Sequence, residues 1–313
     1  MEFTKVIPMK LLVTGGAGFV GSNLALELER LGHEVVIFDN MSVGTFANLR
    51  GFTGTVIADD LSRLSHQRLL EIAPDAIFHE AAITDTMVYD EKLMLQSNLD
   101  PMEPLLRYSG EKGTPLVYAS SAAVYGAAKS PQQEGDAGVP LNVYGFSKWM
   151  CDCAVLRFMK KHPKAHVIGL RYFNVFGPRE QNKGRMASMI YQLAMQMKAG
   201  KNPRIFKFGE QKRDFVYVKD VVKANLLALE KGRSGIYNVG SGKARSFNDV
   251  CNALTAALGV KREIEYFDNP FTGKYQDHTE ASLESSGQGL GYKPEWDLEK
   301  AVKDYAAFLK AGE

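Results

Sequence analysis

Residues 12–21 read Leu-Val-Thr-Gly-Gly-Ala-Gly-Phe-Val-Gly and directly continue an apolar segment, Lys10–Thr14, that predicts a strand. Gly15, Gly18 and Gly21 fit the pattern Gly-x-x-Gly-x-x-Gly, a relative of the dinucleotide-binding fingerprint. In that fingerprint the first glycine allows a tight turn, the second lets backbone N–H groups approach a pyrophosphate, and the third lets the next helix pack closely. We expect this helix to begin near Phe19, which places Phe19 and Val20 at its positive end beside the phosphates.

An acidic residue ends the second predicted strand, Glu34–Asp39. Asp39 stands where the fingerprint carries a carboxylate that accepts hydrogen bonds from the adenosine ribose. By itself Asp39 favours NAD, because its charge would repel the 2′-phosphate of NADP. Its neighbour Asn40 and the nearby Arg50 could soften that repulsion, so the residues leave the choice between NAD and NADP open.

Strands and helices alternate through the first half of the chain, which predicts a doubly wound parallel sheet of the Rossmann type in an α/β fold. The pattern changes after Tyr172, where turn residues and mixed segments begin. We expect a dinucleotide-binding domain over residues 1–173 and a smaller mixed α/β substrate lobe over 174–313, with residues 215–240 returning to the first sheet. The strands and helices expected from periodicity are Lys10–Thr14, Glu34–Asp39, Thr55–Asp59, Ala76–Glu80, Pro115–Ser120, His166–Phe173, Phe215–Val218 and Ile236–Val239, with helices over Asn23–Leu31, Leu64–Ile72, Met102–Glu111, Met186–Ala199 and Val221–Lys231.

The overall composition argues against several classes of protein. A formal charge of +2 is too small for a nucleic-acid-binding surface. No window approaches the run of about 18 apolar residues that spans a bilayer, and the first residues lack the apolar core of a signal peptide. Cys151 and Cys153 are two apart on a predicted helix and lack a second ligand pair, so we expect no metal site. These observations favour a soluble cytoplasmic protein that binds neither nucleic acid nor membrane.

A candidate hydride-transfer site lies in residues 118–148. Tyr144 and Lys148 form Tyr-x-x-x-Lys, and on a helix such residues lie on one face, so both can reach the same ligand. A lysine ammonium and an oxidised nicotinamide would favour the phenolate form of the tyrosine, which can then act as a base. A serine at the end of the fifth strand could hydrogen-bond a sugar oxygen as it becomes a carbonyl. We expect Ser121 to do so, with Ser120 as the alternative.

Further polar or small residues follow the third and fourth strands. Asp60 could hold the adenine, although a solvated turn would explain it equally well. Glu80, Ala81 and Ala82 end the fourth strand, where small residues let the backbone pass close to the cofactor. Asn98 lies on the next helix and could brace the active site, or could be an ordinary polar helix residue.

Five motifs occur in the order found in the extended short-chain dehydrogenase/reductase superfamily, which the chain resembles over nearly its whole length: 14–21, 120–126, 144–148, 171–179 and 213–218. Within it, the segments 140–145, 171–180, 183–189 and 273–276 are similar to those of the heptose 6-epimerases that act on an ADP-linked sugar. The segment 183–189, Lys-Gly-Arg-Met-Ala-Ser-Met, is the most specific of these.

The resemblance implies roles for individual residues. Tyr144 and Lys183 would be the acid/base pair, supported by Ser121 and Lys148. The residues implied to contact the substrate are Ser121, Asn174, Lys183, Arg185, Gln192, Phe206, Arg213 and Tyr275, and Val175 would contact the cofactor. Gln192 and the segment 207–209 match the family only loosely. The resemblance also implies one tightly bound NADP per subunit, with NAD possible, and a homo-oligomer, a pentamer by analogy.

The implied reaction is conversion of ADP-D-glycero-D-manno-heptose to its L-glycero epimer through a transient 6-ketone. The nearest alternative is a UDP-hexose 4-epimerase, which has the same fold and the same first-domain chemistry. A 4,6-dehydratase is disfavoured, because Ala122-Ala123 stand where dehydratases carry Asp-Glu. A dinucleotide-sensing protein without catalysis is disfavoured, because the tyrosine and the lysine are both present.

Overall fold

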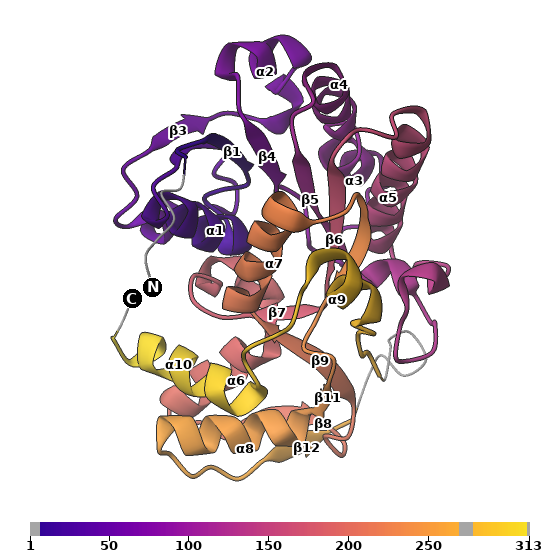
Figure 1. Cartoon of the computed structure of the whole chain (residues 1–313). Coiled ribbons are helices and arrows are strands. Elements are labelled where there is room, and N and C mark those ends of the chain that lie inside the picture. The colour runs from indigo at the N-terminus through magenta and orange to yellow at the C-terminus, as the bar shows by residue number, and fades with distance from the viewer. Residues whose placement is uncertain (1–6, 269–277, 312–313) are drawn as a thin grey trace.

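A parallel sheet of seven strands forms the centre of the computed structural model, which describes residues 7–268 and 278–311 (Figure 1). Its strand order is β10-β6-β5-β4-β1-β2-β3, and each neighbouring pair runs parallel. The strands are β1 (Lys10–Thr14), β2 (Glu34–Asp39), β3 (Thr55–Ala58), β4 (Ala76–His79), β5 (Leu116–Ser121), β6 (Val167–Tyr172) and β10 (Gly235–Val239).

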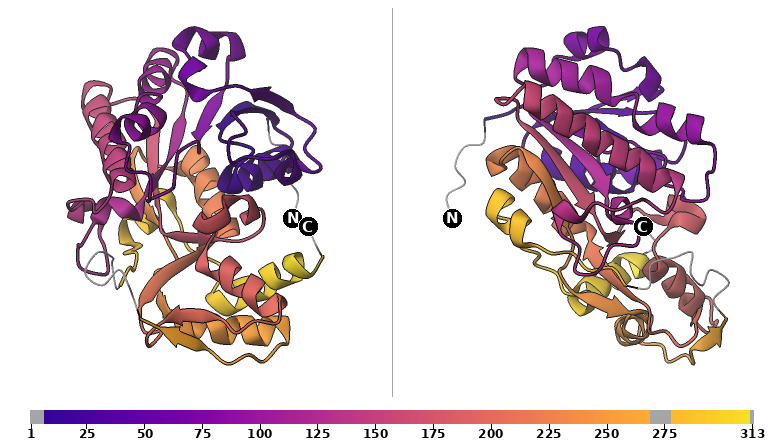
Figure 2. Two further views of the ribbon diagram at one scale, coloured as in Figure 1. Left: turned by 180° about the vertical axis from the view of Figure 1, so that it is seen from behind. Right: turned by 90° about the vertical axis from the view of Figure 1, so that its right-hand side faces the viewer.

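Helices cover both faces of this sheet because alternate side chains of each strand point to opposite sides. Val13 of β1 packs in a core with Leu24 and Val221, whereas its neighbour Leu12 packs with Leu105 and Val155. The first face therefore carries α1 (Phe19–Arg30), α7 (Val218–Lys231) and α9 (Glu284–Leu290), and the second carries α2 (His66–Ile72), α3 (Glu91–Asn98), α4 (Met102–Lys112) and α5 (Val143–Lys161) (Figure 2). The predicted Rossmann-like fold is confirmed.

The second part of the chain builds a smaller lobe below the carboxyl ends of the strands, as Figure 1 shows. One small sheet has the order β11-β9-β7 and another pairs β12 with β8. Its own apolar core includes Ile190, Val250 and Tyr305. The elements of this lobe are β7 (Asn174–Phe176), α6 (Met189–Lys198), β8 (Arg204–Phe206), β9 (Lys212–Tyr217), β11 (Ala244–Ser246), α8 (Phe247–Leu258), β12 (Glu265–Phe267) and α10 (Leu298–Ala311).

Two expectations for the second half need correction. The strand expected near 215 does not enter the large sheet: β9 pairs with β7 and β11, whereas β10 pairs with β6. The helix expected from Met186 begins at Met189, because the Ser188 hydroxyl caps it by accepting a hydrogen bond from the backbone N–H of Tyr191 at 3.1 Å. Residues Gln181–Met186 form a separate 3-10 segment instead. The domain boundary near residue 173 stays a prediction.

In the described part of the chain, no helix is both long and apolar enough to cross a bilayer. Over the same residues, His, Cys, Asp and Glu side chains do not gather in any group of three that could hold a metal ion.

A buried polar network joins β5, β6, α5 and β10. Arg171 donates from Nε to Asp152 Oδ2 at 2.9 Å and from Nη1 to the Tyr125 hydroxyl at 3.0 Å. Tyr118 donates to the other oxygen of Asp152 at 2.8 Å, and Tyr125 donates to Asn238 Oδ1 at 2.6 Å. The side chains of Arg171 and Asp152 are 3% and 0% exposed, so each charge depends on the other for compensation.

Because removal of one partner leaves a buried charge uncompensated, we expect Asp152→Ala to lower the free energy of unfolding by about 3–5 kcal/mol. Urea denaturation measures this quantity. Arg68→Ala is the matched control, since Arg68 pairs with Glu71 at the surface and such pairs contribute at most about 1 kcal/mol. Equal losses in the two variants would contradict a structural role for the buried pair.

Candidate active site

The strand order reverses between β1 and β4, so the loops that follow these two strands lie side by side, where open α/β sheets bind ligands. Gly15 has φ +68°, and a Cβ at this position would stand 2.6 Å from the backbone nitrogen of Ala81. A Cβ at Gly21 would overlap the carbonyl oxygen of Gly15. Gly18 caps α1, which begins at Phe19 as expected. We call residues 15–21 the glycine cradle. It fits a dinucleotide pyrophosphate, because its glycines carry no side chain that would cover the backbone at the N-terminus of α1.

Asp39 lies beside this loop at the carboxyl end of β2. Its Oδ2 accepts a hydrogen bond from the backbone nitrogen of Ala17 at 2.9 Å and its Oδ1 accepts one from Met41 at 2.8 Å. Asn40 donates to Asp60 Oδ2 at 3.2 Å, and hydrogen bonds from Ser62 keep the pKa of Asp60 below its usual value. The end of the cleft predicted to take the ribose and adenine thus carries two carboxylates.

The segment after β4 is held against α5 by Asn98. The Asn98 side chain accepts from the backbone nitrogen of Ile83 at 2.8 Å and donates to its carbonyl oxygen at 3.0 Å. It also donates to Ser147 Oγ at 2.9 Å. Asn98 is fully buried, so it links the backbone that follows Glu80, Ala81 and Ala82 to the helix that carries Tyr144.

Tyr144 and Lys148 lie on the first turns of α5, which Asn142 caps by accepting from the backbone nitrogen of Gly145 at 2.8 Å. Lys148 is 2% exposed and donates from Nζ to the carbonyl oxygen of Ala119 on β5 at 2.9 Å. This hydrogen bond anchors the lysine beneath the carboxyl end of the sheet. Tyr144, four residues earlier, faces a cavity.

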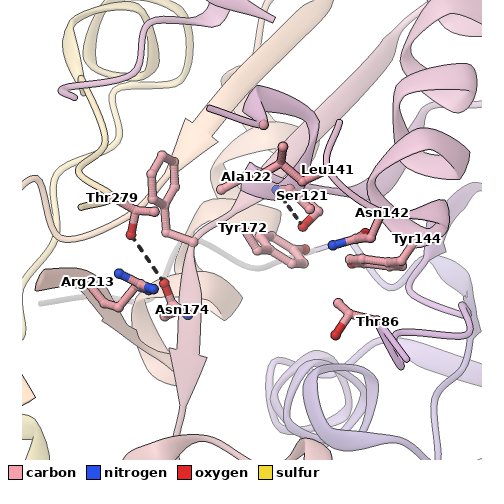
Figure 3. Close-up of a pocket in the computed structure, with 13 residues that line it drawn as sticks. Thr86, Ser121, Ala122, Leu141, Asn142, Tyr144, Tyr172, Asn174, Arg213 and Thr279 are labelled. Carbon is pink, nitrogen blue, oxygen red and sulfur yellow. Dashed lines mark hydrogen bonds between the residues drawn. The ribbon is translucent and has the colours of Figure 1, made fainter. Parts of the chain in front are cut away.

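The cavity is about 220 Å³ in volume and lies between the two lobes (Figure 3). It brings together four residues that were predicted separately: Ser121, Tyr144, Asn174 and Arg213. Tyr144 and Ser121 stand on one side, and Arg213 and Asn174 stand on the other, as Figure 3 shows. Such a volume accommodates a sugar ring. Asn174 then offers an amide, and Arg213 a basic group, at the end opposite Tyr144 and Ser121.

The two candidate serines have different surroundings. Ser121 lines the cavity, and its Oγ caps the short 3-10 turn Ala122–Tyr125 by accepting from the backbone nitrogen of Ala123 at 3.1 Å. Ser120 is 2% exposed, and its Oγ finds no hydrogen-bond partner among the described residues. Since neighbouring residues of a strand face opposite ways, Ser121 is the serine that a ligand in the cavity can reach.

Three predicted residues come from the small sheet below the cavity. Arg213, on β9, is buried and donates from Nη1 to the carbonyl oxygen of Lys212 at 2.8 Å. Asn174, on β7, is exposed, and its Oδ1 lies 3.5 Å from the Thr279 hydroxyl. Val175 pairs with Val216 and packs, partly buried, between the cores of the two lobes.

Lys183 does not line the cavity. Its Nζ lies 5.4 Å from the centre of the Phe19 ring, at the start of α1. Burial lowers the pKa of the Lys183 amine, and the nearby Glu180 carboxyl partly opposes this. The lysine therefore reaches the glycine loop from the second lobe, in a setting that favours the neutral amine more than water does.

The remaining predicted substrate residues that the structure describes do not line the cavity. Arg185 is exposed and forms an ion pair of 2.7 Å with Asp85. Gln192 donates to the carbonyl oxygen of Ala187 at 2.8 Å and thereby holds the backbone after Lys183. Phe206 packs its ring 4.9 Å from that of Phe267. Tyr275 lies outside the described residues.

The sequence analysis missed several residues that line the cavity, among them Thr86, Tyr172 and Thr279. The position of Tyr172 at the carboxyl end of β6 could have identified it, because ligands bind at strand ends. No sequence signal identifies Thr86 or Thr279, since their positions depend on how a loop and a distant segment fold over the cavity.

The model of the NAD dependent epimerase/dehydratase family matches residues 11–240. Among solved structures, the chain is similar to the ADP-L-glycero-D-manno-heptose-6-epimerase of Helicobacter pylori, with 40% identity and a TM-score of 0.90 over 99% of this chain and 98% of that one. It is also similar to the UDP-glucose 4-epimerase of Thermotoga maritima, with UDP-glucose (29% identity, TM-score 0.89, 97% and 100% covered). The Thermus thermophilus UDP-glucose 4-epimerase complex with NAD is a third (27%, 0.84, 97% and 100%).

These similarities agree with the geometry, in which a dinucleotide cradle adjoins a sugar-sized cavity lined by a tyrosine and a serine. The resemblance inferred from the motifs is confirmed. The chain belongs to the NAD-dependent epimerase/dehydratase family and is a nucleotide-sugar epimerase.

Proposed function

We propose that the protein inverts C6 of the heptose in ADP-D-glycero-D-manno-heptose and so forms the L-glycero epimer. The observation that carries this proposal is the position of Lys183. The segment 183–189, the most specific point of resemblance to heptose 6-epimerases, brings this lysine from the second lobe to the first turn of α1. Identity of 40% to the Helicobacter pylori enzyme over nearly the full chain supports the same reaction.

Inversion at a carbinol carbon requires acid/base groups that serve both faces of the carbon. A dinucleotide held by the glycine cradle would supply the acceptor for the hydride and the donor for its return. Tyr144 takes the hydroxyl proton on one side, while Ser121 hydrogen-bonds the oxygen that becomes a carbonyl. Lys148 holds a positive charge beside the tyrosine. Lys183 lies over Phe19 and outside the lining of the cavity. With substrate bound it would supply the proton from the other side, for which the lowered pKa of its amine suits it.

The opposite end of the cavity is suited to the diphosphate of the substrate. Arg213 is buried on β9 and presents a planar guanidinium group that can bind two phosphate oxygens at once. Asn174 lies beside it and offers an amide to a sugar hydroxyl (Figure 3). In this arrangement the diphosphate fixes the sugar so that its reacting carbon lies near Tyr144.

The ribose end of the cradle favours NAD, although the family resemblance predicts a tightly bound NADP. Asp39 is held by two backbone N–H groups, so its carboxylate stays in place where a 2′-phosphate would stand. Asp60, linked to Asn40, adds a second negative charge nearby. Like charges repel, so these two carboxylates would weaken the binding of a 2′-phosphate. We therefore propose NAD as the cofactor, one per subunit and retained through turnover.

A UDP-hexose 4-epimerase is the second candidate function, because 4-epimerases of 27–29% identity share the fold over nearly the whole chain. Assays with ADP-D-glycero-D-manno-heptose, UDP-glucose and UDP-galactose separate the two. Product analysis by mass spectrometry and NMR shows which carbon is inverted. Inversion of UDP-glucose alone would overturn the heptose proposal. A homo-oligomeric state stays a prediction.

We expect Tyr144→Phe and Lys183→Met each to lower turnover by roughly 10²–10⁴, because each removes one acid/base group. Both substitutions leave the glycines and the backbone of the cradle unchanged, so the dinucleotide content of the purified protein should stay near that of the wild type. Steady-state kinetics and dinucleotide content measured on the same preparations check this. Near-normal turnover in either variant would remove that residue from its assigned role.

Ser121 lines the cavity and Ser120 does not, so substitution of the two serines should affect kcat differently. We expect Ser121→Ala to lower kcat by about 10²–10³, the usual loss of one donor to a developing oxyanion. Ser120→Ala is the matched control, because its hydroxyl is buried away from the cavity, and kcat should change little. A larger kcat loss for Ser120→Ala would assign the hydrogen bond to the other serine.

The carboxylate at the ribose end should decide the choice of dinucleotide. We expect the dinucleotide released by denaturing the purified protein to be NAD, and Asp39→Asn to raise the affinity for NADP relative to NAD by about tenfold or more, because it removes the repulsion. Chromatography of the released nucleotide and binding titrations measure both quantities. Recovery of NADP from the wild-type protein would show that Arg50 or the backbone offsets the charge of Asp39.

A further inference from the structure

Glu80 lies at the point where the cofactor loop, the cavity and the buried lysine meet. It follows β4 directly, and its backbone nitrogen donates to the carbonyl oxygen of Thr14 at 3.1 Å. The next residue, Ala81, is the one whose backbone nitrogen excludes a Cβ at Gly15. The side chain of Glu80 therefore starts at the edge of the dinucleotide cradle.

The carboxyl group of Glu80 is fixed from the side of the cavity. The Tyr172 hydroxyl donates to Glu80 Oε1 at 2.9 Å, and it accepts a hydrogen bond from Asn225 Nδ2 on α7 at 2.8 Å. Tyr172 also lines the cavity, as Tyr144 does (Figure 3). Hydrogen bonds through Tyr172 to Asn225 thus fix one carboxyl oxygen of Glu80 behind a residue that lines the cavity.

The Lys148 ammonium acts electrostatically on the Glu80 carboxyl. Its neighbour on β4, His79, is neutral because burial lowers the pKa of its ring to about 3. Burial raises the pKa of Glu80 to about 7, against the opposing effects of the Tyr172 hydrogen bond and of Lys148. Asn225 carries no charge. Ionisation of the Glu80 carboxyl group therefore costs free energy at this place unless a further positive charge comes near it.

An oxidised nicotinamide ring carries such a positive charge, and the ring loses this charge when it is reduced. In the oxidising half-reaction two electrons and one proton leave the carbinol carbon as hydride, and the hydroxyl proton passes to Tyr144. The ring charge falls from +1 to zero, so a fixed carboxylate beside the ring opposes reduction. In the return half-reaction both changes reverse, and the balance over a full turnover is zero.

We propose that Glu80 is a positioning residue whose carboxylate balances the charge of the oxidised nicotinamide and so returns the bound dinucleotide to its oxidised form after each turnover. A cofactor left reduced after escape of a ketone intermediate would inactivate the subunit, and the carboxylate disfavours that outcome. The inference rests on the dinucleotide site and Tyr144 of the proposed function, but not on the identity of the sugar.

The test compares wild-type holoenzyme with Glu80→Gln, which keeps the volume and the oxygen that accepts from Tyr172 while it removes the charge. Each is equilibrated with a dye couple of known potential, and the reduced fraction of the bound dinucleotide is read from its absorbance. We expect the equilibrium to move toward the reduced form by about tenfold, which is ~30 mV for a two-electron couple. Asp220→Asn is the control, since that buried carboxylate binds the backbone of Glu295 and Trp296 instead.

A second measurement on the wild type keeps the inference testable if Glu80→Gln loses its cofactor. Burial raises the Glu80 pKa to about 7 in the cofactor-free protein, and the positive charge of an oxidised nicotinamide lowers it again. The difference between wild type and variant should therefore shrink as the pH falls below 7, and the wild-type potential should depend on pH more steeply there. A uniform pH dependence, or equal potentials in both proteins above pH 7, would overturn the inference. Neither measurement requires a sugar, so a negative heptose assay would not affect the inference about Glu80.

Discussion

The contact between Gly15 and the backbone of Ala81 is the constraint on which the site depends. It exists because β1 and β4 are neighbours whose following loops leave the sheet at the same edge. A side chain at residue 15 would force these loops apart and would move Glu80 away from the cradle. The glycine is therefore needed both for the turn, with φ +68°, and for bringing the cofactor loop to the segment that carries the counter-charge.

The second lobe is tied to α1 and to the turn at residues 46–49 through hydrogen bonds between distant parts of the chain. Arg179 donates to the carbonyl oxygen of Asn48 at 3.1 Å and to Asn23 Oδ1 at 3.1 Å, and Asn23 donates to the carbonyl oxygen of Pro178 at 2.9 Å. Glu180, fully buried, accepts from Gly177 and Ser188 on either side of Lys183. These contacts explain how a lysine of the second lobe reaches the first turn of α1.

Much of the fold could be predicted from the sequence, because its strands are short apolar runs and its first loop requires glycines where a side chain would not fit. The bounds of β1 and β2 agree with the prediction, and Ser121, Tyr144, Asn174 and Arg213 meet at one cavity as their motifs suggest. The rest depends on tertiary contacts. The sequence does not show that Asp85 pairs with Arg185, that Gln192 binds backbone, or that β9 leaves the large sheet, because partners far apart in the chain decide each of these.

The distribution of charge explains why one scaffold can serve several sugars. The groups proposed to act at the reacting carbon and at the nicotinamide, namely Tyr144, Lys148, Ser121 and Glu80, all belong to the first half of the chain, near the large sheet. Asn174 and Arg213 belong to the small sheet below, where a change of sequence leaves the cradle unaltered. Lys183 is the exception, because it comes from the second lobe yet lies over Phe19. A substrate that reacts at C6 instead of C4 places its carbon differently relative to the diphosphate, so an acid/base group carried by the second lobe is the part of the site that must change with the sugar.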